Sequence, residues 1–205
     1  MAQQQSPANQ QRNFKYQIWL MLIIVFGVIA AGFLMVPKTE QQRQRMIELF
    51  GTTNQGALVT PSVDLSPLLA DLSAEEKPKW QVIIAGGTGC DADCEQILFN
   101  TRQVHMLLGK LTGRLKRIYL TDSQQLQALD LEAINREHPF LQVSPIDTQQ
   151  LSELLADSSA AWDMQQSRYF VVTPDHQAVL YYNVDNDANG LLEDLKHLLK
   201  YSPDR

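Results

Sequence analysis

The sequence predicts an α/β domain behind a single N-terminal membrane-spanning helix. Residues 18–36 form an uninterrupted apolar run. Residues 80–200 alternate between short runs rich in β-branched residues and longer segments with helical periodicity, which is typical of an α/β domain. The only two cysteines of the chain, Cys90 and Cys94, lie where the first strand-like run gives way to a helix-like segment. This junction is therefore the first candidate for a functional site.

The apolar run 18–36, IWLMLIIVFGVIAAGFLMV, contains no charged side chain. A helix needs roughly 20 such residues to cross the hydrocarbon core of a bilayer, whereas a buried core helix is usually shorter and carries a polar stripe. No small-residue cleavage site follows the run, because bulky residues lead directly into Pro37. We therefore expect an uncleaved transmembrane anchor over residues 16–37.

The anchor divides the rest of the chain into three further parts. Residues 1–15 are polar and rich in glutamine, which predicts a disordered tail. Residues 38–78 predict a short juxtamembrane helix followed by an extended linker rich in Gly, Thr, Asn and Pro. Residues 79–201 form the folded domain. Lys and Arg flank the anchor in similar numbers, so charge counting does not set its orientation.

The folded domain is expected to have the element order β-α-β-α-β-α-β-β-α. The predicted strands cover residues 80–85, 115–120, 140–146, 168–173 and 178–184, and the last two form a hairpin across the turn 174–177. Pro145 favours an edge position for the third strand. The predicted helices cover residues 93–110 (ended by Gly113), 122–137, 147–157 and 189–200.

The charge distribution excludes several classes of function. All 23 Asp and Glu residues follow the anchor, and the formal net charge is −6. An acidic domain does not attract nucleic acid or an anionic membrane surface. The segment GGTG at residues 86–89 lacks the remaining residues of a nucleotide-binding loop, and no nucleophile elbow or zinc-protease motif is present.

The spacing of Cys90 and Cys94 allows three kinds of chemistry. Four residues make about one helical turn, so both sulfurs share a face, and a Cα separation of about 6 Å admits a disulfide. A helix N-terminus stabilises thiolates. The acidic neighbours Asp91, Asp93 and Glu95 raise thiol pKa values, which disfavours a strong oxidant and suits a soft cation such as Cu(I) or zinc. The same acids also compensate the helix dipole.

A static disulfide is the structural alternative for the pair. A loop of only three intervening residues gains little unfolded-state entropy from closure, which argues mildly against a purely stabilising role. A redox pair, a metal clamp and a structural disulfide therefore remain open on the residues alone.

The order of elements, with a cysteine pair after the first core strand, resembles the thioredoxin fold. More narrowly, the chain is similar to the SCO (SenC) family, thioredoxin-fold proteins that assist assembly of cytochrome c oxidase, and within it to short, membrane-anchored bacterial members. The similarity covers most of residues 15–201. Its motifs are the anchor followed by LFGTTNQGALVTP, the junction GTGCDADC, and the closing pattern RYFVVTPDHQAVLYY with NGLLEDLKHLLK.

This resemblance implies a bacterial inner-membrane protein with a cytoplasmic N-terminus and a periplasmic domain. It also implies that Cys90 and Cys94 handle copper or perform thiol redox chemistry, with an oxidase subunit or its assembly factors as the partner. The copper site of the family adds a distal histidine, and the corresponding position here is Gln165. Met164 could substitute as a soft thioether ligand.

None of the four histidines is a convincing substitute for that ligand. His105 lies eleven residues after Cys94, about 16 Å along a helix, which is too far to share one ion. His138 is expected in a loop, His176 in the hairpin turn and His197 on the surface of the last helix.

Three functional hypotheses follow. The first is a SCO-like accessory protein for cytochrome c oxidase, acting through copper handling or thiol redox. The second is a metal-free, membrane-tethered thiol–disulfide oxidoreductase, which the missing histidine favours. The acidic neighbours and the lack of a proline before Arg168 disfavour it. The third is a non-catalytic interaction module in which the cysteines form a structural disulfide.

Overall fold

The computed structural model describes residues 7–35, 53–69, 77–86 and 90–202. The chain divides into two units, Met1–Thr53 and Asn54–Arg205. The expected juxtamembrane helix and the glycine-rich residues 87–89 lie outside the described residues.

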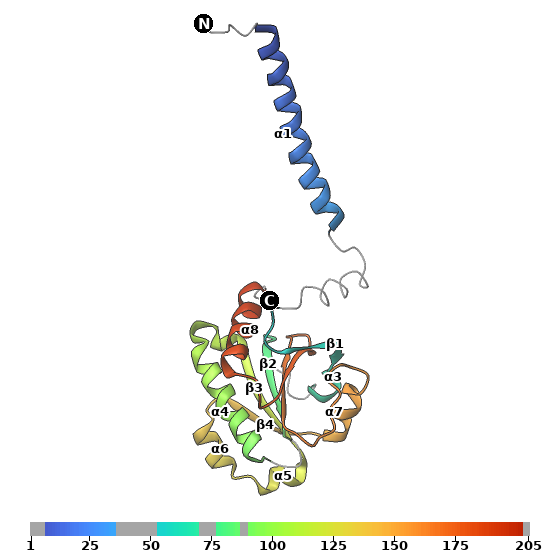
Figure 1. Cartoon of the computed structure of the whole chain (residues 1–205). Helices are drawn as coiled ribbons and strands as arrows, with labels where there is room; N and C mark the ends of the chain where they lie inside the picture. Colours follow the sequence, from blue (N-terminus) through green and yellow to red (C-terminus); the bar gives the residue numbers. More distant parts are fainter. Residues whose placement is uncertain (1–6, 36–52, 70–76, 87–89, 203–205) are drawn as a thin grey trace. The chain divides into compact units, whose positions relative to one another are not determined.

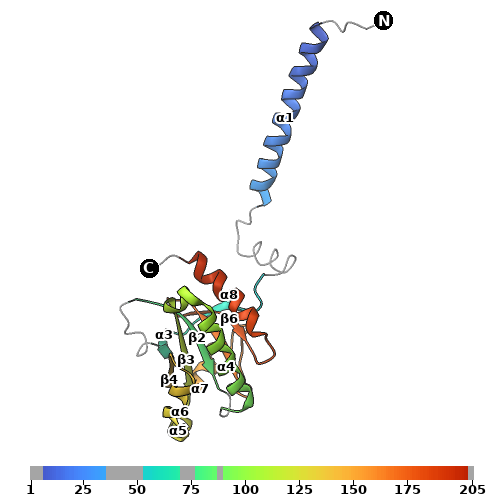
Figure 2. The same ribbon diagram turned by 90° about the vertical axis from the view of Figure 1, so that its left-hand side faces the viewer.

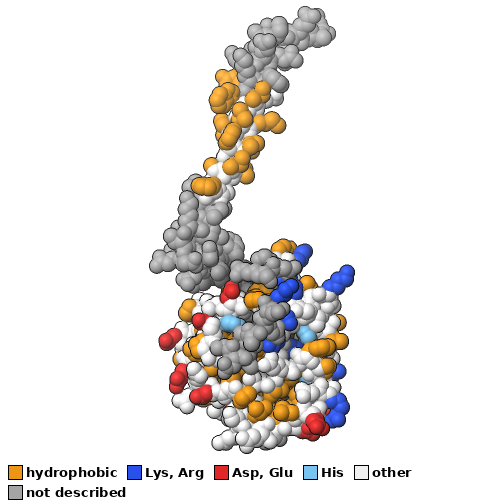
Figure 3. Space-filling model, turned by 180° about the vertical axis from the view of Figure 1, so that it is seen from behind, with side chains coloured by type: hydrophobic (Ala, Val, Ile, Leu, Met, Phe, Trp, Pro, Cys, Tyr) orange, Lys and Arg blue, Asp and Glu red, His pale blue; other side chains and the backbone are white. Residues whose placement is uncertain are grey.

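The first unit contains helix α1 (Pro7–Met35). Its segment Tyr16–Phe33 is long and apolar enough to cross a membrane, and none of its side chains is buried. Hydrophobic side chains project from much of this part of the helix on the face that Figure 3 shows. Part of the segment 1–15 that was expected to be disordered is helical, because α1 begins at Pro7. Proline is favoured at a first helical position, and the glutamines that follow are good helix formers.

The second unit is built on a six-stranded sheet with the order β1-β6-β5-β2-β3-β4. The pairs β2–β3 and β3–β4 are parallel, whereas β5 is antiparallel to both β2 and β6. The strand bounds are β1 (Ala57–Asp64), β2 (Trp80–Ala85), β3 (Leu115–Thr121), β4 (Leu141–Pro145), β5 (Arg168–Val172) and β6 (Gln177–Tyr182). The expected hairpin is thus β5–β6, and the strand that ends in Pro145 lies at a sheet edge as expected.

Strand β1 differs from the expected linker. It pairs antiparallel with β6, starting at Ala57 opposite Tyr181, and closes the sheet on that side. Val59 and Val63 are buried in this strand, and the short helix α3 (Ser66–Leu69) follows it directly. Thr, Pro and Ser residues interrupt the apolar pattern of this segment, so the sequence alone does not indicate a strand. The strand forms because it pairs with the otherwise unpaired backbone groups of β6.

Helices cover both faces of the sheet (Figures 1 and 2). Helices α4 (Ala92–Leu107) and α8 (Ala188–Tyr201) pack on one face, and α3 and α7 (Thr148–Leu155) pack on the other. Helices α5 (Ser123–Ala128) and α6 (Leu131–Glu137) connect β3 to β4.

Two helix boundaries differ from the sequence expectation. Helix α4 ends before Gly109, whose φ of 56° lies in the left-handed region that glycine tolerates, and a 3-10 turn then runs to Arg114. The helix expected over residues 122–137 is split, because Asp130 caps a new helix by accepting the N–H of Ala133 at 3.0 Å.

The sheet separates two hydrophobic cores. Strand β2 is buried along its whole length, so its side chains alternate between the two cores. The α4-side core includes Val82, Ile84, Cys94, Ile97, Tyr119, Tyr169 and Leu195. The α7-side core includes Ile83, Leu120, Leu151, Trp162 and Phe170.

The candidate site lies at the end of the sheet where β2 and β3 finish and β5 begins. Ala85, the last residue of β2, pairs with Leu120 in β3 and with Arg168, the first residue of β5. The chain then enters α4 at the same end. We call this end of the sheet the cysteine edge, because Cys90 and Cys94 lie there.

Candidate functional site

Cys90 and Cys94 are joined by a disulfide. The S–S distance is 2.10 Å and the Cα atoms are 5.0 Å apart, slightly closer than the separation of about 6 Å expected from the sequence. Cys90 lies just before α4, and Cys94 lies in its first turn. The sulfurs therefore lie at the N-terminus of a 16-residue helix.

The two cysteines differ in exposure. Cys94 has no exposed surface and belongs to the α4-side core, whereas Cys90 is only partly buried against that core. Of the two cysteines, only Cys90 therefore has surface that solvent or a partner can reach. Exchange at such a disulfide depends on which sulfur is accessible.

The acidic residues around the pair serve the helix. Asp91 is the N-cap of α4, and its carboxylate accepts the backbone N–H of Cys94 at 2.9 Å. Asp93 and Glu95 are exposed in the first turn, where they complement the helix dipole. The bond to Asp91 also occupies the N–H of Cys94, so this group is not free to stabilise a charge on its sulfur.

Gln165 and Met164 lie in the loop that leads into β5, whose first residue, Arg168, pairs with Ala85 at the cysteine edge. Gln165 is exposed in this loop. Met164 instead packs against the α7-side core, on the opposite face of the sheet from Cys94. The thioether is thus separated from the two sulfurs by the sheet.

The described residues do not complete a copper site. Within ranges 7–35, 53–69, 77–86 and 90–202, no group of three or more His, Cys, Asp and Glu side chains converges. The two sulfurs are bonded to each other. The amide of Gln165 is a hard donor that does not match the soft Cu(I) ion.

The four histidines lie away from the cysteine edge. His105 is buried near the C-terminal end of α4, with its ring 5.9 Å from that of Phe140. His138 precedes the N-terminal end of β4, and His176 lies in the β5–β6 turn, both toward the opposite edge of the sheet. His197 is exposed in the second half of α8, beside Tyr201.

The sequence interpretation missed two buried polar residues beneath α4. Arg117 has no exposed surface, and its Nη2 donates to the carbonyl of Leu98 at 2.9 Å and to Oγ1 of Thr101 at 3.0 Å. Its Nε and Nη1 have no hydrogen-bond partner among the described residues. Burial, and secondarily the charge of Arg102, lowers the pKa of Arg117 to about 10.

Tyr119 is the second of these residues. It lies two positions after Arg117 on the same face of β3, and its buried hydroxyl lies near that of Thr121. Burial raises its pKa, hydrogen bonding with Thr121 acts in the opposite direction, and the carboxylates of Asp122 and Asp91 raise it further. The alternation in LKRIYL placed both residues on one face, which was the available signal.

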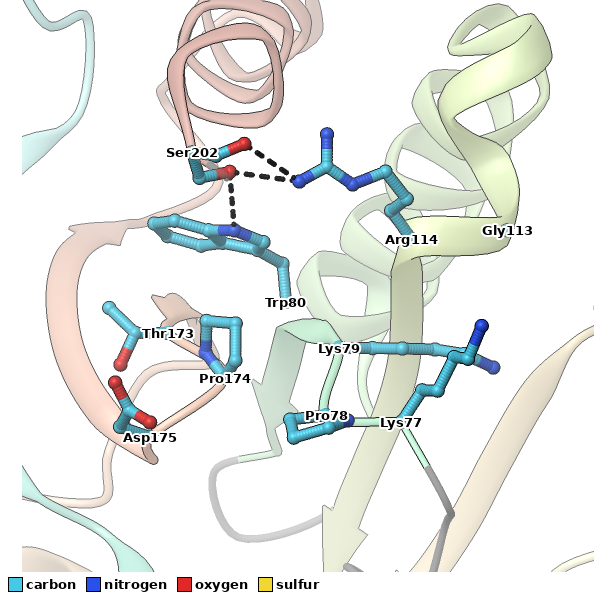
Figure 4. A pocket seen from close by; sticks show the side chains of 10 residues that line it. All are labelled: Lys77, Pro78, Lys79, Trp80, Gly113, Arg114, Thr173, Pro174, Asp175 and Ser202. Carbon is cyan, nitrogen blue, oxygen red and sulfur yellow. Dashed lines mark hydrogen bonds between the residues drawn. The ribbon is translucent and has the colours of Figure 1, made fainter. Parts of the chain in front are cut away.

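A separate pocket of about 460 Å³ lies at the opposite end of the sheet (Figure 4). Trp80, the first residue of β2, donates from its indole N–H to Oγ of Ser202 at 3.1 Å. Arg114 donates to the carbonyl and hydroxyl of the same serine at 3.0 and 3.2 Å. These bonds attach the end of α8 to the sheet. The pocket is separated from the disulfide by the length of β2.

Solved structures similar to this chain include two Sco proteins and one thiol–disulfide protein. BsSco, described as a member of the Sco family of cytochrome c oxidase assembly proteins, is 15% identical with a TM-score of 0.46 over 62% of this chain and 83% of its own. Yeast Sco1 with copper bound is 14% identical, with a TM-score of 0.48 over 75% and 97% of the two chains. A thiol:disulfide interchange protein from Bacteroides sp. is 11% identical, with a TM-score of 0.46 over 75% and 93%.

A search of curated protein sequences found no match. A family model, in contrast, covers most of the second unit. It matches residues 80–202, from the first residue of β2 to the end of α8, and therefore includes the disulfide and five of the six strands, but not β1 or α3. The chain belongs to the family described as the transmembrane-like, thioredoxin-like, C-terminal domain.

Proposed function

We propose that the protein is a membrane-anchored thiol–disulfide exchange protein that acts through Cys90 and Cys94 as a SCO-like accessory factor in cytochrome c oxidase assembly. The observation that supports this most directly is the disulfide at the start of α4, with Cys90 partly exposed and Cys94 buried. In this proposal α1 crosses the bacterial inner membrane, the N-terminus is cytoplasmic and the domain is periplasmic.

The proposed reaction transfers two electrons from a partner dithiol. A partner thiolate attacks Sγ of Cys90, the Cys90–Cys94 bond breaks, and its electron pair leaves on Sγ of Cys94. The second partner thiolate then attacks the partner sulfur of the mixed disulfide and releases Cys90. The partner ends as a disulfide and this chain as a dithiol, which takes up the two protons that the partner lost.

The surroundings of the pair favour a mild exchange reaction. The negative charges of Asp91, Asp93 and Glu95 oppose thiolate formation, and Asp91 already binds the N–H of Cys94. A low thiol pKa is what makes a disulfide strongly oxidising. We therefore expect a disulfide that reacts with a docked partner rather than with thiols in general.

The identity of the partner rests on the resemblance to SCO proteins. Among the two activities that this resemblance implies, the described residues favour redox action on the thiols of an oxidase subunit over stable copper carriage. The pair supplies two sulfurs, Gln165 replaces the expected histidine, and Met164 packs on the opposite face of the sheet.

Trapping experiments test the exchange reaction directly. In the full chain in detergent, Cys94→Ser leaves the accessible thiol of Cys90, whereas Cys90→Ser leaves only the buried thiol. The remaining thiol of each variant is first converted to a mixed disulfide with a small thiol-reactive disulfide. We expect the first variant then to capture the reduced oxidase subunit, and the second to capture little. Equal capture by the two variants would contradict the assigned roles.

A complementation experiment separates the proposal from a purely structural disulfide. A deletion strain is expected to lose oxidase activity under copper limitation, and the wild-type chain should restore it. The double variant Cys90→Ser with Cys94→Ser should fail to restore it although the protein accumulates in the membrane. Full restoration by the double variant would instead support the non-catalytic interaction module.

A further inference from the structure

Opening the disulfide leaves a sulfur in an unusual position. Cys94 has no exposed surface, so water cannot reach its sulfur. The backbone N–H of Cys94, which lies closest to it along the chain, is already bound to the carboxylate of Asp91. A thiolate released there needs another hydrogen-bond donor, because an uncompensated charge in a core is strongly unfavourable.

Helix α4 and strand β3 run in opposite directions on one face of the sheet. Arg117, in the middle of β3, reaches the carbonyl of Leu98 and the hydroxyl of Thr101 in α4. From Arg117 the strand continues toward the cysteine edge, where α4 begins, and Tyr119 lies two strand residues, about 7 Å, farther in that direction. Cys94 lies about 6 Å, one helical turn, from Leu98 in the same direction. Tyr119 is therefore the next side chain of this face toward the end of α4 that carries Cys94.

Three further observations agree with this placement. Tyr119 and Cys94 belong to the same hydrophobic core. The charge of Asp91, the residue that binds the N–H of Cys94, is close enough to contribute to the raised pKa of Tyr119. The hydroxyl of Tyr119 is buried, and its one polar neighbour named by the electrostatics, Thr121, lowers the phenol pKa and therefore acts as a donor to the phenol oxygen. The proton of the Tyr119 hydroxyl remains available to an acceptor in the core.

We propose that the hydroxyl of Tyr119 donates a hydrogen bond to Sγ of Cys94 when the disulfide is open, and so stabilises the dithiol state. This inference rests on the proposed function and adds a residue to it. The electron pair of the broken S–S bond resides on Cys94, and Tyr119 keeps its proton throughout. The proton that Cys94 finally takes up comes from the partner dithiol.

The first test measures the redox equilibrium of the full chain in detergent against glutathione. We expect Tyr119→Phe to shift the equilibrium constant about tenfold toward the disulfide, which corresponds to a reduction potential lower by about 30 mV. Tyr169→Phe is the matched control, because it removes a second hydroxyl from the same core while its ring stacks on Tyr182 at 4.9 Å. The control should keep the wild-type potential.

The same variants separate a redox role from a packing role. Thermal unfolding of the oxidised and reduced forms should show that Tyr119→Phe destabilises the reduced form more than the oxidised form. A packing residue would lower both melting temperatures together and leave the potential unchanged. An unchanged potential, or an equal shift in Tyr169→Phe, would overturn the inference.

A second test follows the thiolate itself. In the Cys90→Ser background only Cys94 titrates as a thiol, and the ultraviolet absorbance of the thiolate reports its pKa. Adding Tyr119→Phe should raise that pKa, whereas the same change in the Cys94→Ser background should leave the pKa of Cys90 unaltered. Neither measurement requires a partner protein. A wild-type chain that fails to exchange with its partner would therefore count against the proposed function and not against Tyr119.

Discussion

The carboxylate of Asp194 in α8 accepts a hydrogen bond from the backbone N–H of Gly56 at 3.0 Å, across 138 positions of the chain. The same carboxylate accepts the N–H of Gln55 at 2.9 Å and the hydroxyl of Tyr182 at 2.7 Å. Asp194 is buried, so three donors depend on one side chain. It attaches the segment that enters the domain to its last helix.

Asp194→Ala should therefore lower the free energy of unfolding by about 2–4 kcal/mol, because it leaves several buried donors without an acceptor. Urea unfolding of the full chain in detergent measures this loss. Asp187→Ala is the control, since it removes the exposed N-cap of the same helix and should cost only about 1 kcal/mol. Equal losses in the two variants would show that the buried contacts add nothing beyond a cap.

Copper binding should respond to a single substitution in the loop before β5. We expect the reduced chain to lose Cu(I) to a competing chelator, because the described residues bring no group of three or more His, Cys, Asp and Glu side chains together. The resemblance to SCO proteins sets Gln165 at the position of the family histidine. On that basis, Gln165→His should raise Cu(I) retention at least tenfold.

Anaerobic competition with a Cu(I) chelator measures this retention, with Gln166→His as the neighbouring control. Tight one-to-one binding by the wild-type chain, abolished by Cys90→Ser with Cys94→Ser, would contradict this expectation and restore copper handling as the leading activity. Met164→Leu should leave retention unchanged, since Met164 packs against the α7-side core.

Acidification should destabilise the domain through His105. Burial, and secondarily the charge of Arg117, lowers the pKa of His105 below its ordinary value. As the pH falls through about 6.5, the unfolded chain binds a proton that the folded chain does not, so the free energy of unfolding decreases. The decrease stops once the pH is below the folded-state pKa.

His105→Gln should therefore flatten this part of the pH profile, although it lowers stability at neutral pH. Unfolding in urea at a series of pH values between about 7 and 5 provides the measurement. The exposed His197→Gln serves as the control and should keep the wild-type slope. An unaltered slope in His105→Gln would assign the pH dependence to other groups, such as His138, whose pKa is also lowered by burial.

Arg117 should be replaceable by an apolar side chain of similar length. Its guanidinium is fully buried, and two of its nitrogens have no partner among the described residues. Removing such a charge without leaving a void is often neutral or stabilising. We expect Arg117→Met to keep or raise the free energy of unfolding by about 1–2 kcal/mol, and Arg117→Ala to lower it by about 2–4 kcal/mol through the cavity it creates. A large loss in Arg117→Met would show that the cation itself is required.

Local patterns in the sequence were sufficient for the elements with strong periodicity. The buried run of β2, the hairpin β5–β6 and the amphipathic α8 were all predicted close to their observed bounds. The disulfide was predicted as one of three possibilities, because two cysteines one helical turn apart meet a condition that depends only on local geometry. The N-cap at Asp130 also depends only on neighbouring residues, but the helix that begins there was not predicted.

Strand β1, the contacts of Asp194 and the place of Tyr119 were decided by the tertiary structure. Strand β1 has a weak pattern of its own and forms because β6 offers an edge far along the chain. Asp194 and Gly56 meet only after α8 docks. Tyr119 and Cys94 share a core only once α4 has packed over β3. The sequence by itself determined which segments are apolar, helical or extended and where the cysteines lie, because those properties depend on neighbours along the chain. The set of buried side chains around the sulfurs depended on packing between distant segments. No local sequence pattern determines that set.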